Sequence, residues 1–275
     1  AEKWIKVHKE QFKRLGVIGD WKDYYSTMSF DAEAQIVREL GKFLKEGSLY
    51  RGFKPVLWST VEKTALADAE VEYKDHKSNT IYAEFHIKKS DKDFLKDASV
   101  IIWTTTPWTI PANEAISVNQ KLDYVIAQSS DGSLIFIAND LLEEVSENVG
   151  INYKKRVLVK GSKLDGIIYK HPLFDKRSPV VLGGDYITTE SGTGLVHTAP
   201  GHGVDDFNTG KKYNLPITCT VDSKGFLTKE AGKFEGLNVL KDANTVIIND
   251  LIKTGCLLKE IPYEHRYPYD WRTKK

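Results

Sequence analysis

The spacing of apolar side chains changes near residue 50. Before that point, apolar residues recur every three or four positions in two segments, residues 1–15 and 31–47, which end at Gly16 and Gly47. This is the period of an amphipathic helix, and glycine is common just past a helix C-terminus. We therefore predict two helices, joined by an aromatic-rich loop over residues 16–28.

After residue 50 the chain carries short runs of β-branched and aromatic residues, separated by turn residues such as Asp131-Gly132 and Gly183-Gly184. Many short strands at intervals of roughly 8–12 residues are typical of barrels and sandwiches rather than of βαβ units. The predicted strands cover residues 53–60, 69–73, 79–87, 99–105, 123–128, 133–138, 155–161, 166–174 and 178–183. Helical patterns interrupt them at residues 141–149, 205–213 and 239–255.

These elements predict an α+β fold: a β-barrel-like domain with a few peripheral helices and a helical N-terminal segment. The expected division is a helical segment over residues 1–50, a β-rich domain over 51–260 and an exit segment over 261–275. The exit segment mixes aromatic and charged residues without a helical or strand stop, and the chain opens inside a helix pattern. The alternatives are frayed termini and a segment of a larger protein, and the second is favoured.

Composition narrows the classes of function. Lys plus Arg number 39 and Asp plus Glu 38, a net charge of +1 that does not indicate a nucleic-acid coat or a membrane-surface patch. No apolar run approaches the ~18 residues of a membrane span, and the charged N-terminus is unlike a signal peptide. Cys219 and Cys256 lie far apart, which argues against a disulfide framework and favours a reducing compartment. We expect a cytoplasmic location, with an organellar matrix as the alternative.

One segment with candidate chemistry is residues 101–118, where an apolar run ends at Trp103 and is followed by Thr104, Thr105 and Thr106. Two prolines close the segment, and proline cannot donate to a sheet ladder. Consecutive strand side chains face opposite ways, so one or two of these hydroxyls should point into a cavity beside the strand. The alternative is that the threonines are there for strand propensity alone.

The other segment is residues 191–207, where a short apolar run delivers His197 after two glycines. Asp205 and Asp206 then begin a helix, whose N-terminal dipole favours acidic side chains. Capping accounts for one aspartate but not obviously for both. His197, His202 and the two aspartates are also a conceivable metal set, yet the two histidines lack the helical register that brings ligands to one face.

Other sequence motifs of catalysis are missing. The chain has no G-x-S-x-G elbow, no P-loop and no G-x-G-x-x-G after a strand, so serine hydrolases, NTPases and dinucleotide enzymes lose their main support. What remains is a pocket lined by hydroxyl, histidine and aspartate side chains on a β-rich scaffold, with no covalent nucleophile and no evident metal.

At these two segments the sequence resembles a known family. WTTTPWTIPAN (103–113) and GTGLVHTAPGHGVDDF (192–207) are similar to the paired signatures of the editing domain inserted into the catalytic domain of isoleucyl-tRNA synthetases. The flanks QFKRLGVIGDWKDYYSTM, FKPVLWS, ALADAEVEY and PYDWRTKK resemble the same insertion, so the resemblance covers nearly the whole chain. Valyl and leucyl editing domains typically carry arginine at the position of Thr106, an acidic residue at that of Trp108, and no histidine at that of His197.

The resemblance implies an activity and its partners. It implies a hydrolase that deacylates valine mischarged on isoleucine tRNA, with valyl-adenylate as a further substrate, and it implies no cofactor. The partners would be the 3′ end of mischarged tRNA(Ile), its valine moiety and the remainder of the synthetase, without a membrane. The synthesis motifs H-I-G-H and K-M-S-K-S are absent, so we expect no formation of aminoacyl-tRNA.

The resemblance also implies roles for individual residues. Asp206 would anchor the substrate ammonium by charge-assisted hydrogen bonding. Thr104 and Thr105 would act on the ester and the attacking water, and Thr106 would line the same site. Among the remaining substrate-binding residues, Asn113 would orient the loop or the adenosine, and Trp103 and His197 would form walls.

One departure from the family concerns zinc. Many bacterial relatives carry cysteine pairs near the stretch WSTVEK and a cysteine near the position of Asp270. Here Ser59, Thr60, Val61, Glu62 and Asp270 stand at those places, so a structural zinc is doubtful and no metal is expected.

Two rival functions stay open. One is a non-hydrolytic module that binds the tRNA 3′ end. The other is a metal-dependent hydrolase that uses His197, His202 and either Asp205 or Asp206.

Overall fold

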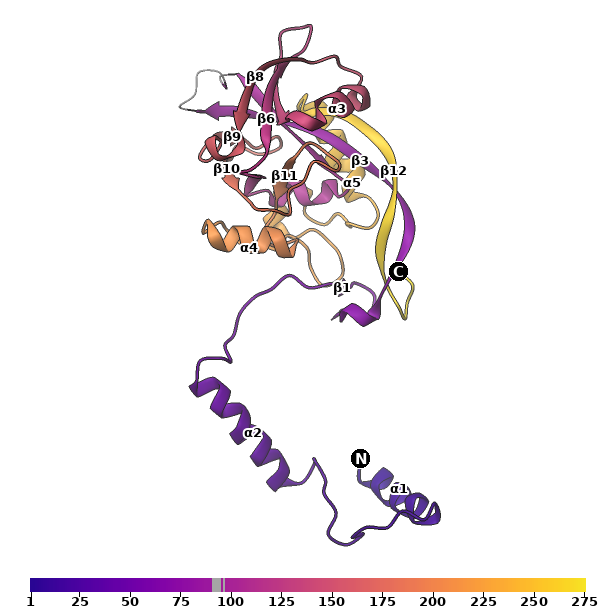
Figure 1. Cartoon of the computed structure of the whole chain (residues 1–275). Coiled ribbons are helices and arrows are strands. Elements are labelled where there is room, and N and C mark those ends of the chain that lie inside the picture. The colour runs from indigo at the N-terminus through magenta and orange to yellow at the C-terminus, as the bar shows by residue number, and fades with distance from the viewer. Residues whose placement is uncertain (91–94, 96) are drawn as a thin grey trace. The chain divides into compact units, whose positions relative to one another are not determined.

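The first unit of the chain is helical. The computed structural model describes residues 1–90, 95 and 97–275, and it divides into two compact units, residues 1–53 and 54–275. Helix α1 spans Glu2–Arg14 and helix α2 spans Phe30–Lys45 (Figure 1). Ser29 caps α2, because its side chain accepts a hydrogen bond from the Ala32 amide. Both helices predicted from the apolar spacing are confirmed.

The second unit is built on a mixed ten-stranded sheet. Its order is β11-β5-β10-β9-β3-β4-β7-β6-β8, with β12 paired to β3 outside this path. Parallel pairing joins β5 to β10 and β4 to β7, and the other pairs are antiparallel. The strands are β3 (Val71–Lys89), β4 (Ala98–Thr104), β5 (Ala115–Val118), β6 (Asp123–Gln128), β7 (Leu134–Ala138), β8 (Lys154–Lys160), β9 (Ile168–Lys170), β10 (Arg177–Leu182), β11 (Leu195–Thr198) and β12 (Leu257–Asp270).

The remaining elements of the second unit are short. A hairpin of two-residue strands, β1 (Trp58–Ser59) and β2 (Thr64–Ala65), precedes the sheet. The helices are α3 (Leu142–Val149), α4 (Val204–Lys212) and α5 (Ala243–Lys253), which confirms the three predicted helical segments. The 3-10 helices are η1 (Asp68–Glu70), η3 (Pro107–Ala112), η4 (Asn139–Leu141), η5 (Gly161–Lys163) and η6 (Lys229–Phe234). Among the described residues, no helix is long and apolar enough to cross a membrane.

The α+β class is confirmed, but the sheet does not close into a barrel. In the described part of the chain, its path ends at β11 on one side and at β8 on the other, and these two strands do not pair. Strand spacing indicates that many short strands form, whereas closure depends on which strands pair and in what register. The barrel-like form predicted from spacing is therefore replaced by an open mixed sheet.

The longest feature of the sheet is a ribbon made by β3 and β12 (Figure 1). The register runs from Asp270 opposite Val71 to Leu257 opposite Ala83. This pairing joins the two strands predicted over residues 69–73 and 79–87 into one. It also makes a strand of the C-terminal tail, to which the sequence analysis assigns no element, and the partner supplies its hydrogen bonds.

The two chemistry-bearing segments become neighbours through the core. Val100, Ile101 and Ile102 of β4 are completely buried, and β4 then ends at Thr104. Strand β11 contacts β4 although the two are not adjacent in the sheet order. The end of β4 therefore lies next to the segment that leads through β11 into α4.

Candidate active site

A cavity of about 350 Å³ lies where these two segments meet. This volume is at the lower end of the range for small-ligand pockets. The lining residues come from the end of β4, from the segment before β11, and from β11 and the start of α4: Trp103, Thr104, Thr105, Thr106, Thr109, Tyr186, Ile187, Thr188, Ser191, Gly192, Thr193, Gly194, Leu195, Val196, His197, Ala199, His202 and Asp206. All but one of the site residues named from the sequence line this cavity, and the exception is Asn113.

The threonine run turns the chain into the cavity. The Thr104 side-chain oxygen accepts a hydrogen bond from the Thr106 amide at 3.1 Å and lies 3.3 Å from the Thr106 hydroxyl. These contacts end β4 and start η3, whose prolines could not extend a strand. Within the described residues, the half-buried Thr105 hydroxyl has no hydrogen-bond partner. It is therefore available to a ligand in the cavity.

Trp103 forms one side of the cavity. Its ring packs edge-on against Tyr263 of β12, with ring centroids 5.4 Å apart. On the other side it meets Gly192, where a β-carbon would lie 3.3 Å from the ring and where φ is +82°. Gly194 likewise has φ of +71°, and a β-carbon there would lie 2.3 Å from that of Ala138. Both positions require glycine, which explains the two glycines in this segment.

His197 stands on β11 and is 8% exposed. Its Nδ1 lies 2.8 Å from Asn113 Nδ2, and its Nε2 lies 2.9 Å from the Thr109 hydroxyl oxygen. An amide nitrogen can only donate, so Nδ1 accepts and the ring proton is on Nε2. Nε2–H donates to Thr109, whose hydroxyl donates to the Thr106 carbonyl at 2.9 Å. Both ring nitrogens are thus occupied by the protein.

Burial also fixes the charge of His197. The loss of solvent, with smaller contributions from the neighbouring His171 and His202, lowers the pKa of His197 to about 3. The ring is therefore neutral at physiological pH. A neutral imidazole with both nitrogens hydrogen-bonded has no free lone pair for a proton from water. The His197 ring therefore contributes its bulk to the cavity wall.

Asn113 lies behind His197 rather than in the cavity. It is completely buried, and its Nδ2 donates both to His197 and to the Ala115 carbonyl at 2.9 Å. Its Oδ1 accepts a hydrogen bond of 2.6 Å from the hydroxyl of Tyr169 on β9. In this structure Asn113 contacts the histidine of the wall and does not line the space that a ligand would fill.

Asp206 lines the cavity from the first turn of α4. Its Oδ2 accepts a hydrogen bond from the Ala199 amide at 2.9 Å. Burial raises the pKa of Asp206 to about 6, opposed by the Ala199 hydrogen bond and aided by the nearby Asp205 charge. Asp205 is exposed and does not line the cavity. Of the two aspartates, Asp206 is the one that a ligand would meet.

The sequence reasoning missed part of the lining. His202 lines the cavity and was considered only as a metal ligand; its Nε2 lies 3.0 Å from the Thr220 hydroxyl oxygen, and its ring meets Trp108 edge-on. Tyr186, Ile187 and Thr188 also line the cavity and lie outside both segments named from the sequence. The hydroxyl of Tyr186 lies 3.2 Å from that of Thr209 on α4, a long-range contact with no signature in sequence spacing.

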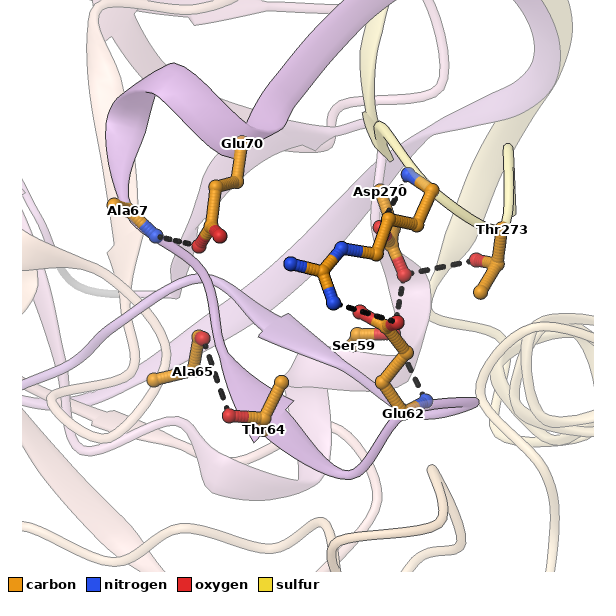
Figure 2. Close-up of polar contacts among 9 residues, drawn as sticks. Ser59, Glu62, Thr64, Ala65, Ala67, Glu70, Asp270 and Thr273 are labelled. Atoms are coloured by element: carbon orange, nitrogen blue, oxygen red, sulfur yellow. Dashed lines mark hydrogen bonds and ion pairs between the residues drawn. The ribbon is translucent and has the colours of Figure 1, made fainter. Parts of the chain in front are cut away.

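The residues with metal-ligating side chains do not gather here. Among the described residues, no group of three or more His, Cys, Asp or Glu side chains is arranged to hold a metal ion. At the place of the doubtful zinc, Figure 2 shows Asp270 linked to Ser59 and Thr273, both at 2.8 Å, with Glu62 beside them. Asp270 also accepts from the Arg272 amide at 2.9 Å. A hydrogen-bonded carboxylate thus connects the β1–β2 hairpin to the end of β12.

The sequence profile of a family described as tRNA synthetases class I (I, L, M and V) matches residues 1–219. Among curated proteins, the chain is 66% identical to the isoleucine–tRNA ligase of Prochlorococcus marinus strain NATL1A and 54% identical to that of Pelagibacter ubique. Each match covers 100% of this chain, but only 30% and 31% of the respective relative. The chain therefore spans about a third of the length of these relatives.

Two solved structures share the fold. The crystal structure of GlLeuRS-CP1 aligns with a TM-score of 0.51 and 12% identity, over 65% of this chain and 97% of its own. The editing domain of the P. knowlesi cytosolic leucyl-tRNA synthetase aligns with the same score and identity, over 68% of this chain and 97% of its own. At this identity the likeness is one of fold.

Proposed function

This chain belongs to the class I tRNA synthetases of the I, L, M and V group, and on that premise we propose that it is an editing hydrolase that deacylates valine esterified to isoleucine tRNA. High identity to isoleucine–tRNA ligases and a fold shared with editing domains support an editing role. The choice of valine rests on the physical problem that an isoleucine enzyme faces and on the shape of the cavity.

An isoleucine enzyme must distinguish isoleucine from valine, which is smaller by a single methylene group. A binding site discriminates against a substrate one methylene smaller by only ~1–3 kcal/mol, a magnitude established on isoleucine enzymes themselves and adopted here rather than worked out from the cavity. A second site must then destroy the valine ester and spare isoleucine. Such a site needs an anchor for the ammonium, polar groups for the ester and water, and a wall against the larger side chain.

The cavity offers these three features. Asp206 places a carboxylate in the cavity, and a charge-assisted hydrogen bond to the substrate ammonium would favour the ionised form. The free hydroxyl of Thr105 and the neighbouring Thr104 can donate to the ester and accept from water. His197 and Trp103 close the sides with rings that the surrounding structure holds in place.

Hydrolysis at this site would depend on how the protein positions the ester and the attacking water. An aminoacyl ester is already activated, so alignment of the water and stabilisation of developing charge can lower the barrier without a covalent intermediate. Because both nitrogens of His197 are occupied, the histidine does not act as the base. The resemblance to the family implies that a free hydroxyl of the terminal adenosine helps to orient the water.

The partners follow from the same proposal. The 3′ end of mischarged tRNA(Ile) would bring its terminal adenosine and valine into the cavity, and the remainder of the synthetase would hold the rest of the tRNA. Valyl-adenylate is a further substrate, since it carries the same activated valine. We place this activity in the cytoplasm, where tRNA is charged.

The observation that carries the proposal is that Asp206 and the threonine run, about a hundred residues apart in sequence, line one cavity together with His197. The test is single-turnover deacylation of valyl-tRNA(Ile) by the 275-residue chain. We expect release of valine well above the spontaneous rate and sparing of isoleucyl-tRNA(Ile). Binding of the tRNA without release of valine would replace the proposal with the binding-module function, and loss of activity on chelation would replace it with a metal-dependent one.

A further inference from the structure

The hydrogen bonds behind His197 form a directed relay. The Tyr169 hydroxyl donates to Asn113 Oδ1, Asn113 Nδ2 donates to His197 Nδ1, and His197 Nε2–H donates to Thr109. Thr109 in turn donates to the Thr106 carbonyl. All four hydrogen bonds form together only when the donors and acceptors are assigned in this way, with the ring proton on Nε2. The relay therefore specifies the tautomer of His197.

We propose that Tyr169, which lies outside the cavity, is a positioning residue that fixes the tautomer and orientation of His197 and thereby sets the size limit of the cavity. This inference rests on the proposed function, in which His197 is the wall that excludes isoleucine. Tyr169 would touch no substrate, and its effect would pass through Asn113.

The hydroxyl of Tyr169 is well suited to direct an amide. Tyr169 is completely buried on β9, and its ring packs edge-on against Phe85 with centroids 5.4 Å apart. Burial raises the pKa of the Tyr169 hydroxyl well above its usual range, so the group stays protonated and remains a donor. The Tyr169 hydroxyl therefore acts toward Asn113 as a hydrogen-bond donor, and the acceptor is Oδ1.

Removing this donor would release the amide. Asn113 Oδ1 is buried and would be left without a partner, which disfavours its present orientation. The other tautomer of His197, with its proton on Nδ1, could supply a new donor to a rotated Oδ1. The Ala115 carbonyl, which now accepts from Nδ2 at 2.9 Å, opposes that rotation. Loss of Tyr169 should therefore give a mixture of two states rather than a complete switch.

The change would reach the cavity through Thr109. In the second tautomer Nε2 carries no proton, so the Thr109 hydroxyl would turn to donate to it and would no longer donate to the Thr106 carbonyl, which keeps its hydrogen bond from the Thr109 amide at 3.0 Å. Thr106 lines the cavity. The turn that follows β4 would lose one of the two hydrogen bonds to this carbonyl, the imidazole would be held less firmly, and the wall against a larger side chain would weaken.

The test compares Tyr169→Phe with Tyr82→Phe in the 275-residue chain. Tyr82 is the matched control, because its hydroxyl is also hydrogen-bonded to an asparagine side chain, accepting from Asn148 Nδ2 at 3.0 Å, but the asparagine that contacts His197 is Asn113. Two quantities are measured for each: the ¹⁵N shifts of the His197 ring, which report its tautomer, and single-turnover deacylation of valyl- and isoleucyl-tRNA(Ile). Thermal unfolding shows whether each variant is folded.

We expect Tyr169→Phe to convert the single Nε2–H pattern of His197 into a mixed one, and to raise isoleucyl deacylation by about tenfold, or 1.4 kcal/mol, with valyl deacylation little changed. Tyr82→Phe should change neither quantity beyond its effect on stability. An unchanged His197 spectrum with unchanged discrimination in Tyr169→Phe would overturn the inference. If the unmodified chain releases no valine, the proposed function fails, while the spectrum still decides whether Tyr169 sets the tautomer.

Discussion

Replacing His197 by alanine separates a steric role from a catalytic one. The imidazole is 8% exposed and stands between β11 and the cavity, so its removal leaves space where the extra methyl of isoleucine would otherwise collide. Forcing one methylene into a well-packed site costs ~1–3 kcal/mol. Because each 1.36 kcal/mol is a factor of ten in rate, His197→Ala should raise isoleucyl-tRNA(Ile) deacylation by roughly 5- to 150-fold.

The assay is a pair of single-turnover time courses with valine and isoleucine on the same tRNA. Valyl deacylation should persist in His197→Ala, since neither ring nitrogen is free to take a proton. His171→Ala is the matched control: His171 is also a buried histidine with hydrogen-bonded nitrogens, but it does not line the cavity. It should leave discrimination unchanged. Loss of valyl activity in His197→Ala, with isoleucyl-tRNA still spared, would refute the steric role and make His197 a catalytic base.

Three other outcomes follow from the site and the hairpin. Replacing Thr104 and Thr105 by valine should lower the single-turnover rate far more than it weakens tRNA binding, because the hydroxyls act mainly in the transition state; equal losses in both would favour a binding module. Since burial raises the pKa of Asp206 to about 6 and the anchor needs the ionised form, kcat/KM should fall about tenfold per pH unit below that value, and a profile that stays level down to pH 5 would contradict this. Burial alone would raise the pKa of Asp270, but hydrogen bonds from the Arg272 amide, Ser59 and Thr273 outweigh it and hold the pKa at about 2, below the usual 3.8. A carboxyl whose pKa is lower in the folded state stabilises the fold at pH values above its pKa in the unfolded chain. Asp270→Asn should therefore lower Tm at pH 7, and the difference in Tm from the unmodified chain should shrink as pH falls from 4 to 2. A difference in Tm that stays constant over this range would be inconsistent with this.

The sequence predicts the local parts of this fold well. The helices follow from apolar spacing and glycine stops, and α4 follows from the acidic pair after a Pro-Gly turn. The threonine run and the segment around His197 stand out because each combines polar side chains with residues that break a strand. These signals depend on neighbours in the chain, which is the information that a sequence displays directly.

The remaining features depend on contacts between distant segments. Strand β12 receives its hydrogen bonds from β3, which lies more than 170 positions earlier in the chain. The contact of Asn113 with Tyr169 joins residues 56 positions apart, and nothing in either segment marks the other. The resemblance to editing domains suggested Asn113 as part of the site, but only the hydrogen bonds show that it contacts His197 from behind.

The central claim is that Asp206 binds the substrate ammonium in the cavity. It is tested most directly by comparing Asp206→Asn with Asp205→Asn in single-turnover deacylation of valyl-tRNA(Ile). The two positions share the first turn of α4, and asparagine at 206 can still accept the hydrogen bond of the Ala199 amide. A lost charged hydrogen bond of ~1.5–3 kcal/mol predicts a fall in kcat/KM of roughly 10- to 150-fold for Asp206→Asn, with Asp205→Asn close to the unmodified rate. An unimpaired Asp206→Asn, or a loss confined to Asp205→Asn, would contradict the account.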